Sequence, residues 1–281
     1  PAETTGVARL DIRKLRENPL FKTFKEMNYD KHLIASEVMA GETGLDIDSI
    51  GRIWLGWVEK GRGVVALEGD FDVKRISQTI GARKDCAAVK IPGCQFAAMV
   101  PAKGVPGQQN LAAVIDGRTI AVGEAVLTNE FVRSFSSGKP AQDLASKKLL
   151  SGGKIFEAAI FEVPKELLKE KKFLENVVSG TFDIDLQKDA DMNMSLTLSS
   201  PEQAEGVQQM LQGLISLQKM SKRQNMPANP LQEEFLRSLV IKSQGSSIVA
   251  NAKISGGSLL KAMQSGNLFD GGKRGAPPAR R

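Results

Sequence analysis

The sequence predicts an α+β protein in which a β-α-β-β-α-β(β)-α unit occurs twice in tandem, with antiparallel-dominated sheets and helices on one face. A hairpin that leads into an amphipathic helix occurs in Ile50–Ile80 and again in Val177–Leu214. A further hairpin and helix follow in Asn110–Phe135 and in Leu239–Met263. Residue identity between the repeats is low, so the duplication is inferred from element order. Two unrelated halves of the same class are the alternative.

We expect the first repeat to span residues 1–138. Alternating apolar residues in Gly6–Ile12 predict a strand, and helical spacing predicts a helix over Arg13–Met27 that Asn18-Pro19 interrupts. Asp116-Gly117 is typical of a tight hairpin turn. The other elements expected here are a loop at Gly41–Ser49, a hairpin turning near Lys60-Gly61, a helix Phe71–Ile80 capped by Asp70, strands Ala87–Ile91, Gln95–Val100, Leu111–Ile115 and Thr119–Val122, and a helix from Thr128 to Phe135.

A polar linker at residues 139–154, rich in Ser, Gly and Lys, separates the repeats. The second repeat covers residues 155–266, and residues 267–281 form a disordered basic tail. The elements expected in the second repeat are strand Ile155–Glu162, helix Lys165–Phe173, hairpin Val177–Leu186 and Asp191–Leu198, a helix capped by Ser200 that runs to about Met220, helix Leu231–Leu236, strands Leu239–Ser243 and Ser246–Asn251, and helix Ser258–Met263.

Each repeat begins with the β-α-β-β-α-β order, which is compatible with ferredoxin-like elements. The sheets of the two repeats either join edge to edge or face one another across their helices. The sequence leaves both arrangements open.

The composition is that of an ordinary globular chain of 281 residues, with 41% hydrophobic, 25% charged and 5% aromatic residues. Few aromatics disfavour a specific nucleic-acid platform, which stacks bases on exposed rings. The formal charge of +6 comes partly from the tail, where we expect either a solubilising end or a contact to an anionic polymer, lipid or wall surface. The tail cations are Lys273, Arg274, Arg280 and Arg281.

The cysteines Cys86 and Cys94 flank a short segment. They are either two small, separate thiols or, if the intervening loop is wide, a disulfide. The sequence contains no apolar run of about 18 residues, so we expect no transmembrane segment.

Residues with catalytic patterns are scarce. His32 is the single histidine, four Ser-x-x-Lys matches lack their partner motifs, and no phosphate-binding glycine loop follows a strand. We therefore expect no enzyme, no cofactor and no metal site.

Four residues are candidates for ligand or partner contact. Asp183 and Asp185 share one face of a strand and could hold a cation, although solvated strand edges commonly carry such pairs. Trp54 and Trp57 lie on opposite faces if their segment is a strand, so we expect one in the core and the other on a face or at a contact between halves.

Three runs resemble a class of uncharacterised secreted or lipoprotein-type proteins of planctomycetes and related bacteria. They are PAETTGVARLDIRKLRENPLFKTFKE at the start, VVALEGDFDVKRI after the first hairpin and NLAAVIDGRTIAVGEAVLTNEFV later. The resemblance implies an extracytoplasmic protein of the periplasm, cell envelope or medium, and it supplies no catalytic residues. A cytoplasmic location is the alternative.

The sequence thus indicates a non-enzymatic extracytoplasmic protein that binds a protein or envelope component, or builds an assembly. One alternative is an enzyme or small-ligand carrier that uses the carboxylates at a cleft between the repeats. The other is binding of an anionic polymer or nucleic acid through the basic tail.

Overall fold

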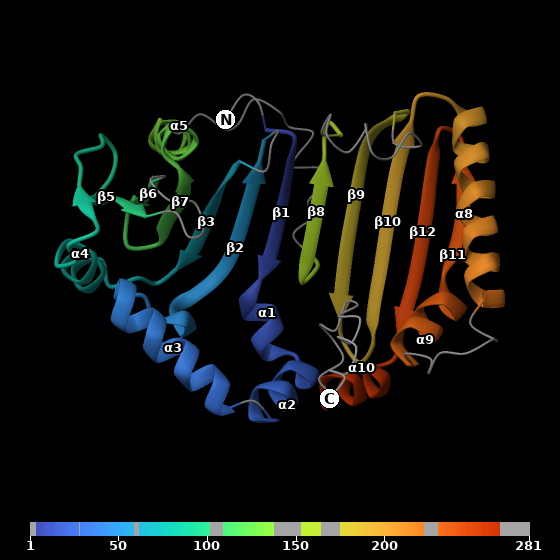
Figure 1. Cartoon of the computed structure of the whole chain (residues 1–281), viewed down its shortest axis with the longest axis horizontal. Helices are drawn as coiled ribbons and strands as arrows, with labels where there is room; N and C mark the ends of the chain where they lie inside the picture. Colours follow the sequence, from blue (N-terminus) through green and yellow to red (C-terminus); the bar gives the residue numbers. More distant parts are fainter. Residues whose placement is uncertain are drawn as a thin grey trace, which may run out of the picture.

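A single β-sheet of 12 strands runs through the whole molecule (Figure 1). The computed structural model describes residues 4–27, 29–58, 62–101, 109–137, 153–163, 175–221 and 230–264. The strand order is β11-β12-β10-β9-β8-β1-β2-β3-β7-β6-β5-β4, and neighbouring strands are antiparallel. The fold is therefore α+β with an antiparallel sheet, and its two halves join edge to edge.

Short, largely apolar segments form the strands, as their alternation predicts. In the first half they are β1 (Gly6–Asp11), β2 (Ile50–Trp57), β3 (Gly63–Gly69), β4 (Ala87–Ala88), β5 (Phe96–Pro101), β6 (Gln109–Val114) and β7 (Thr119–Glu124). In the second half they are β8 (Phe156–Ile160), β9 (Val177–Leu186), β10 (Ala190–Leu198), β11 (Val240–Gln244) and β12 (Ser247–Ile254).

The strand order is the same in both directions from the central pair of β1 and β8. One direction runs β1-β2-β3-β7-β6, and the other runs β8-β9-β10-β12-β11. In both directions the outer two strands form a hairpin, and the second strand of that hairpin in the chain, β7 or β12, pairs with the third strand from the centre, β3 or β10. The strands β5 and β4 extend the first half alone. A duplicated unit would produce this order around its junction.

Eight helices in the described part of the chain flank the sheet (Figure 1). In Figure 1, α1, α2, α3 and α10 lie beyond the lower ends of the strands, and α8 stands at the outer side of β11. Their bounds are α1 (Ile12–Glu17), α2 (Pro19–Met27), α3 (Tyr29–Thr43), α4 (Val73–Gly81), α5 (Ala125–Ser136), α8 (Pro201–Ser221), α9 (Pro230–Ser238) and α10 (Gly256–Gln264), with a 3₁₀ turn at Ile47–Ser49.

The helices cover both faces of the sheet, which corrects the expectation of helices on one face. We call the face that carries Arg9 and Trp54 the Arg9 face, and the opposite face, which carries Trp57, the Trp57 face. On the Trp57 face, α4 packs through Ile76 and Ile80, and α8 packs in a cluster with Leu196 and Ile248. On the Arg9 face, α5 packs onto Ala113 and Ala121 through Leu127 and Val132. Small alanines on the strands make room for this second layer.

The ferredoxin-like arrangement is also wrong. That arrangement requires a helix that crosses the sheet and places the next strand parallel to the first. Here α1, α2 and α3 lie beyond the strand ends, and the chain returns so that β2 pairs antiparallel with β1, from Gly6↔Trp57 to Asp11↔Arg52.

Asn18 connects the first half to the second. Its Oδ1 accepts a hydrogen bond from Leu20 N at 2.9 Å, at the start of α2. Its Nδ2 donates to the carbonyl oxygens of Leu186 at 2.7 Å and Gln187 at 3.0 Å, in the turn between β9 and β10. The predicted interruption at Asn18-Pro19 is therefore real, and the break also holds the halves together.

Two predicted helix starts are wrong by a few residues. The N-cap of α4 is Asp72, which accepts from Arg75 N at 3.0 Å, and Asp70 instead donates its backbone N–H to Ser49. Helix α5 begins after Glu124, so Thr128 lies inside it and is fully buried. The Ser200 cap is confirmed, because its Oγ accepts from Gln203 N at 3.3 Å.

Candidate functional site

The junction of the two halves carries a connected row of charged side chains on the Arg9 face. The register of β8, β1 and β2 places Glu157, Arg9 and Trp54 directly beside one another. These residues come from both halves of the chain. They are half-buried or buried, although most of this face over β9 and β10 consists of Ser, Thr, Asn and Asp.

Arg9 and Glu157 form an ion pair in the interior. Arg9 Nη2 lies 2.7 Å from Glu157 Oε2, and the two side chains are 7% and 4% exposed. Arg9 also donates to the Lys154 carbonyl oxygen at 3.1 Å, and its guanidinium lies 5.8 Å from the Trp54 ring centre. Its Nε is buried and has no hydrogen-bond partner among the residues that the structure describes. Each charge compensates the other, which a buried charge requires.

Arg52 extends this row toward β3. It donates to Asp11 Oδ2 at 3.3 Å and to Glu68 Oε2 at 3.1 Å, and Trp54 Nε1 donates to Glu68 Oε1 at 2.9 Å. Burial raises the pKa of Asp11, but the hydrogen bond from Lys14 N and the Arg52 guanidinium outweigh burial and hold the pKa below its usual value. The row therefore contains charges that are matched internally, with Asp11 ionised at neutral pH.

The tryptophans lie on opposite faces, as the spacing predicts. Trp54 is part of the charged row. Trp57 lies over Gly6 of β1, where an added Cβ would collide with the indole ring. Both side chains are half-buried, so the expectation that one of them lies in the core is wrong, and each contacts the neighbouring strand β1. Trp54 and Trp57 therefore join β2 to β1.

The structure places Asp183 and Asp185 on the Arg9 face of β9 and gives each an internal partner. Asp183 accepts from Asn193 Nδ2 at 2.8 Å. Asp185 lies 3.5 Å from Lys154 Nζ and also accepts from Gln187. Among the described residues, no group of three or more His, Cys, Asp or Glu side chains could hold a metal ion.

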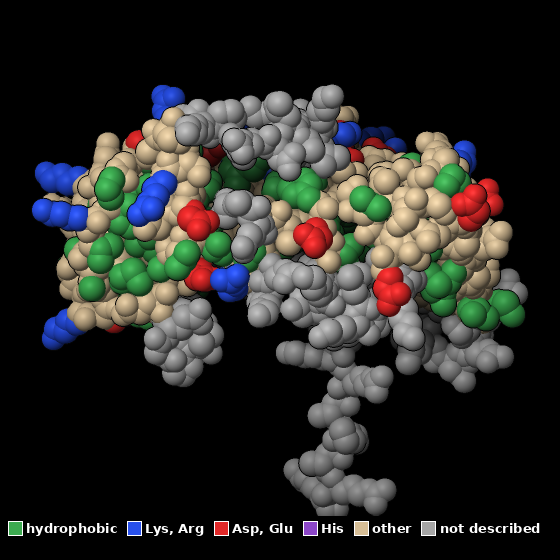
Figure 2. Space-filling model, turned by 90° about the horizontal axis from the view of Figure 1, so that it is seen from above, with side chains coloured by type: hydrophobic (Ala, Val, Ile, Leu, Met, Phe, Trp, Pro, Cys, Tyr) green, Lys and Arg blue, Asp and Glu red, His purple; other side chains and the backbone are tan. Residues whose placement is uncertain are grey.

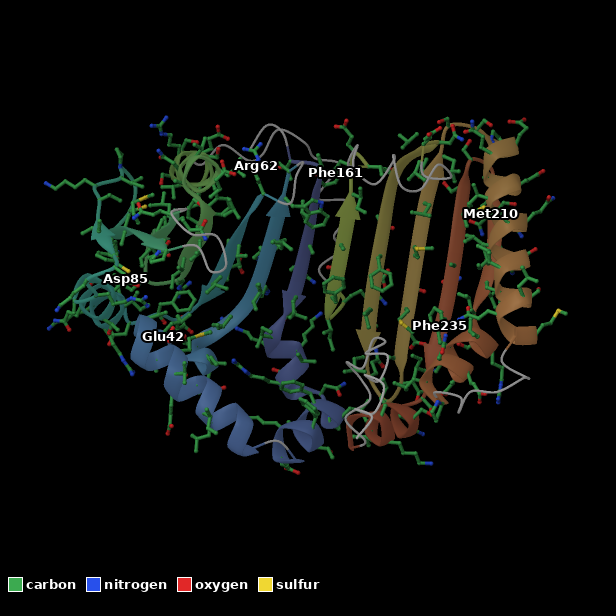
Figure 3. All side chains as sticks on the ribbon, viewed as in Figure 1. Glu42, Arg62, Asp85, Phe161, Met210 and Phe235 are labelled. Atoms are coloured by element: carbon green, nitrogen blue, oxygen red, sulfur yellow. The ribbon has the colours of Figure 1, made fainter. Side chains whose placement is uncertain are left out.

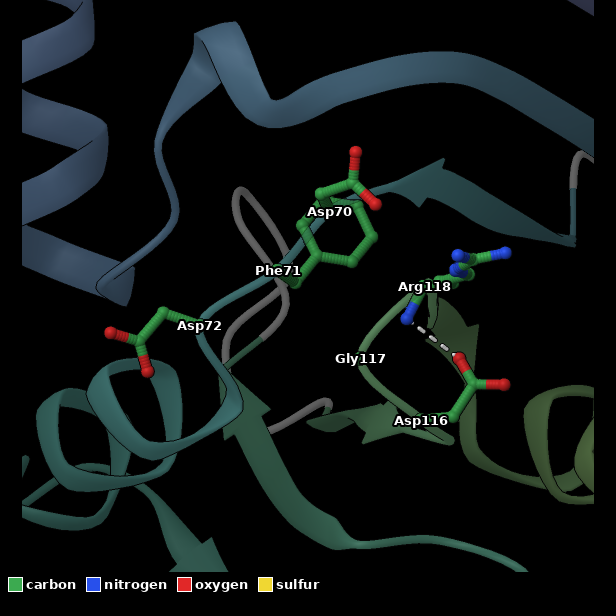
Figure 4. A pocket seen from close by; sticks show the side chains of 6 residues that line it. All are labelled: Asp70, Phe71, Asp72, Asp116, Gly117 and Arg118. Atoms are coloured by element: carbon green, nitrogen blue, oxygen red, sulfur yellow. Dashed lines mark hydrogen bonds between the residues drawn. The ribbon is translucent and has the colours of Figure 1, made fainter.

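The surface depressions are shallow and their polar groups are engaged. One of about 590 Å³ is lined by Asp70, Asp72, Asp116 and neighbouring residues (Figure 4). Asp72 caps α4, and Asp116 accepts from Arg118 N at 2.8 Å within the predicted hairpin turn. A second depression of about 340 Å³ lies beside Asn18 and Asp185. These carboxylates shape turns and caps rather than converging on a bound group.

The two cysteines are separate thiols on opposite sides of the sheet. Cys86 packs against the core cluster of α4, and Cys94 packs against the cluster of α5. Burial raises the pKa of both thiols. The side chain of His32 and the tail cations at 273–281 lie outside the described parts of the chain.

Exposed apolar side chains are concentrated on two helices, a feature that the sequence reading missed. Helix α3 exposes Leu33, Ile34, Val38 and Met39, and α8 exposes Met210, Leu214, Leu217 and Met220. Met210 is labelled in Figure 3, and apolar side chains are visible at the end of the molecule where α8 lies in Figure 2. Contiguous exposed apolar groups mark interaction surfaces in soluble proteins. The signal was present in α8, whose apolar residues exceed the number that one buried face can hold.

The fold and the site define an α+β protein with a single extended antiparallel sheet, a charged junction and two exposed apolar helices. No family model and no curated protein matches the chain. Crystal form IV of TP0453 is a solved structure with a similar fold. It has a TM-score of 0.51 and 10% identity, and the match covers 92% of each chain. At this identity the likeness concerns the fold alone. No helix in the described residues is long and apolar enough to cross a membrane.

Proposed function

We propose that the chain is a non-enzymatic extracytoplasmic protein that binds a protein partner or builds an assembly in the cell envelope. The exposed apolar groups of α3 and α8 are the observation that carries this proposal. Eight large apolar side chains on these two helices are between 37% and 68% exposed. Such exposure is costly in water and is offset when a partner covers it.

The charged row at the junction has a structural role in this proposal. Arg9, Glu157, Arg52 and Glu68 neutralise one another in the folded chain, so they position strands rather than await a ligand. The extracytoplasmic location rests on the resemblance of three sequence runs to secreted and lipoprotein-type proteins.

The test uses the full chain expressed in a bacterium from its native gene. Cells are fractionated, and the mass of the extracytoplasmic species is measured on native gels. We expect a complex larger than the 30.3 kDa chain. A variant with Ile34→Gln, Val38→Gln, Leu214→Gln and Leu217→Gln should lose the complex. A control variant with Asp183→Asn and Asp185→Asn should retain it.

Recovery of the natural chain in the cytoplasm, or as a monomer in the extracytoplasmic fraction, would contradict the proposal. Loss of the complex in the Asp183→Asn and Asp185→Asn variant alone would favour the carboxylate-based alternative instead.

A further inference from the structure

The outward side of α8 carries a regular apolar line. Gly206, Met210, Gly213, Leu217 and Met220 follow one another at intervals of four, three, four and three residues, which places them along one side of the helix. Leu217 and Met220 are 62% and 68% exposed. This spacing is that of the contact line between two packed helices.

The opposite side of α8 is already engaged with the sheet. Ala204 is fully buried, and Val207 packs against the same cluster as Ile248 of β12. Gln208 fixes the helix to the edge strand β11, because its Nε2 donates to the Ile241 carbonyl oxygen at 3.4 Å and its Oε1 accepts from Ser243 N at 3.1 Å. The helix is therefore held with its apolar line directed away from the sheet.

The two glycines in the line make no close approach within the described parts of the chain. A Cβ added at Gly206 or Gly213 would meet no atom of the described residues within 4 Å. Glycine inside a helix is destabilising relative to alanine. Glycines on a helix surface allow a second helix to approach closely and leave hollows for its large side chains.

The alternation of small and large residues fits the same helix turned end to end. In an antiparallel pair centred on Gly213, Gly206 of one helix lies opposite Met220 of the other, and Met210, which falls opposite Ser216, lies next to Leu217. Each large side chain at the ends then meets a glycine. The charges favour the same orientation, because Glu202 and Glu205 lie in the first turns and a parallel pair would bring these like charges of both copies together.

We propose that α8 forms an antiparallel helix pair with α8 of a second copy of this chain. The pair would have a twofold axis near Gly213. This inference rests on the proposed function and names one partner for it. Helix α8 stands at the outer side of the edge strand, where another molecule can approach it (Figure 1).

Sedimentation velocity of the purified full chain over a range of concentrations tests the association. We expect a monomer–dimer equilibrium that Leu217→Gln weakens at least about tenfold, because truncation of a central apolar anchor commonly costs that much. Val126→Gln is the matched control, because Val126 is 62% exposed on α5 in the first half. It should leave the equilibrium unchanged.

The double variant Gly206→Ala and Gly213→Ala distinguishes the effect of the glycines on helix stability from their effect on the contact between two helices. Alanine should raise the unfolding midpoint of the dilute monomer, because it favours the helix, and weaken dimerisation, because it fills the hollows. Higher stability with unchanged dimerisation would overturn the close-packed arrangement.

Cysteine cross-linking tests the orientation in a background with Cys86→Ala and Cys94→Ala. With copper phenanthroline as oxidant, a Gly213→Cys chain should link to itself. A Gly206→Cys chain should link to a Met220→Cys chain and not to itself. Efficient self-linking at all three positions would indicate a parallel pair and overturn the proposal.

A chain that stays monomeric at high concentration would also overturn the inference. If that monomer bound phosphatidylglycerol vesicles through Leu214 and Leu217, a lipid surface would be the partner, and both the homodimer and the proposed protein-binding function would fall. If the native-gel complex persisted, another protein would be the partner, and the proposed function would stand without the homodimer.

Discussion

Replacing Arg9 by Met removes one charge from the ion pair at the junction of the halves. Glu157, which is 4% exposed, would remain as a buried carboxylate whose partner at 2.7 Å has gone. Breaking a buried pair in this way costs about 3–5 kcal/mol of the free energy of unfolding. That is a large part of the free energy of unfolding of a typical domain, which is roughly 5–15 kcal/mol.

Urea unfolding at pH 7 measures this loss, with circular dichroism and tryptophan fluorescence as signals. Trp54 lies 5.8 Å from the Arg9 guanidinium, so its emission reports on the junction directly. The control is Arg62→Met. Arg62 pairs with Glu124 at 3.2 Å, but the two side chains are 45% and 24% exposed, so we expect a loss of less than about 1 kcal/mol.

The double variant Arg9→Met and Glu157→Leu removes both charges of the pair and should recover most of the lost stability, because neither charge is left in the interior without the other. A double-mutant cycle then gives the coupling between the two positions. If Arg9→Met cost no more than Arg62→Met, the pair would not hold the halves together and the reasoning would be refuted.

Three further predictions follow from the same contacts. Because folding lowers the pKa of Asp11, its carboxylate should stabilise the folded chain fully above its unfolded pKa near 3.9, and this stabilisation should be lost as the pH falls through the lower folded value. The difference in the free energy of unfolding between the natural chain and Asp11→Asn should therefore shrink below about pH 4. A difference that stays constant in acid unfolding curves would argue against this. Asn18→Ala should cost about 2–3 kcal/mol and speed amide exchange in the β9–β10 turn, since a helix cap and two hydrogen bonds are lost; unchanged exchange would be contrary evidence. Cys86 and Cys94 should both react with a thiol reagent, slowly in the native chain and fast in the unfolded chain. An intact mass that is lower by the two hydrogens lost on disulfide formation would show that the two thiols are not separate.

Local signals in the sequence predicted most elements of the fold. The Asp116-Gly117 turn, the break at Asn18-Pro19 and the helix after Ser200 depend on neighbouring residues, and all three are present. The cap of α4 was misplaced because Asp70 and Asp72 both precede the helix, and backbone pairing with Ser49 occupies Asp70.

The pairing of β1 with β8 could not be predicted. These strands are far apart in the chain, and short strands carry no local signal of their neighbour. The register that places Arg9 beside Glu157 is therefore known only from the structure, although an arginine within an apolar strand hinted at a buried partner. The opposite faces of Trp54 and Trp57 were predictable, because strand alternation decides them.

The excess of apolar residues in α8 could be recognised in the sequence, but which of them are exposed could not be predicted, because this depends on which helix sides the sheet covers. Leu211 and Leu214 look alike in the sequence, yet Leu211 is half-buried and Leu214 is 55% exposed. Only packing of α8 on β11 and β12 distinguishes them.

Photo-cross-linking in intact cells tests the central claim, that the exposed apolar helices contact a partner. A photoreactive phenylalanine is placed at Val38 of α3 or Leu214 of α8, with Val126 of α5 as a control that is at least as exposed. The account predicts cross-linked products from one or both test positions and none from the control. The absence of products at both test positions, or equal products at Val126, would contradict it.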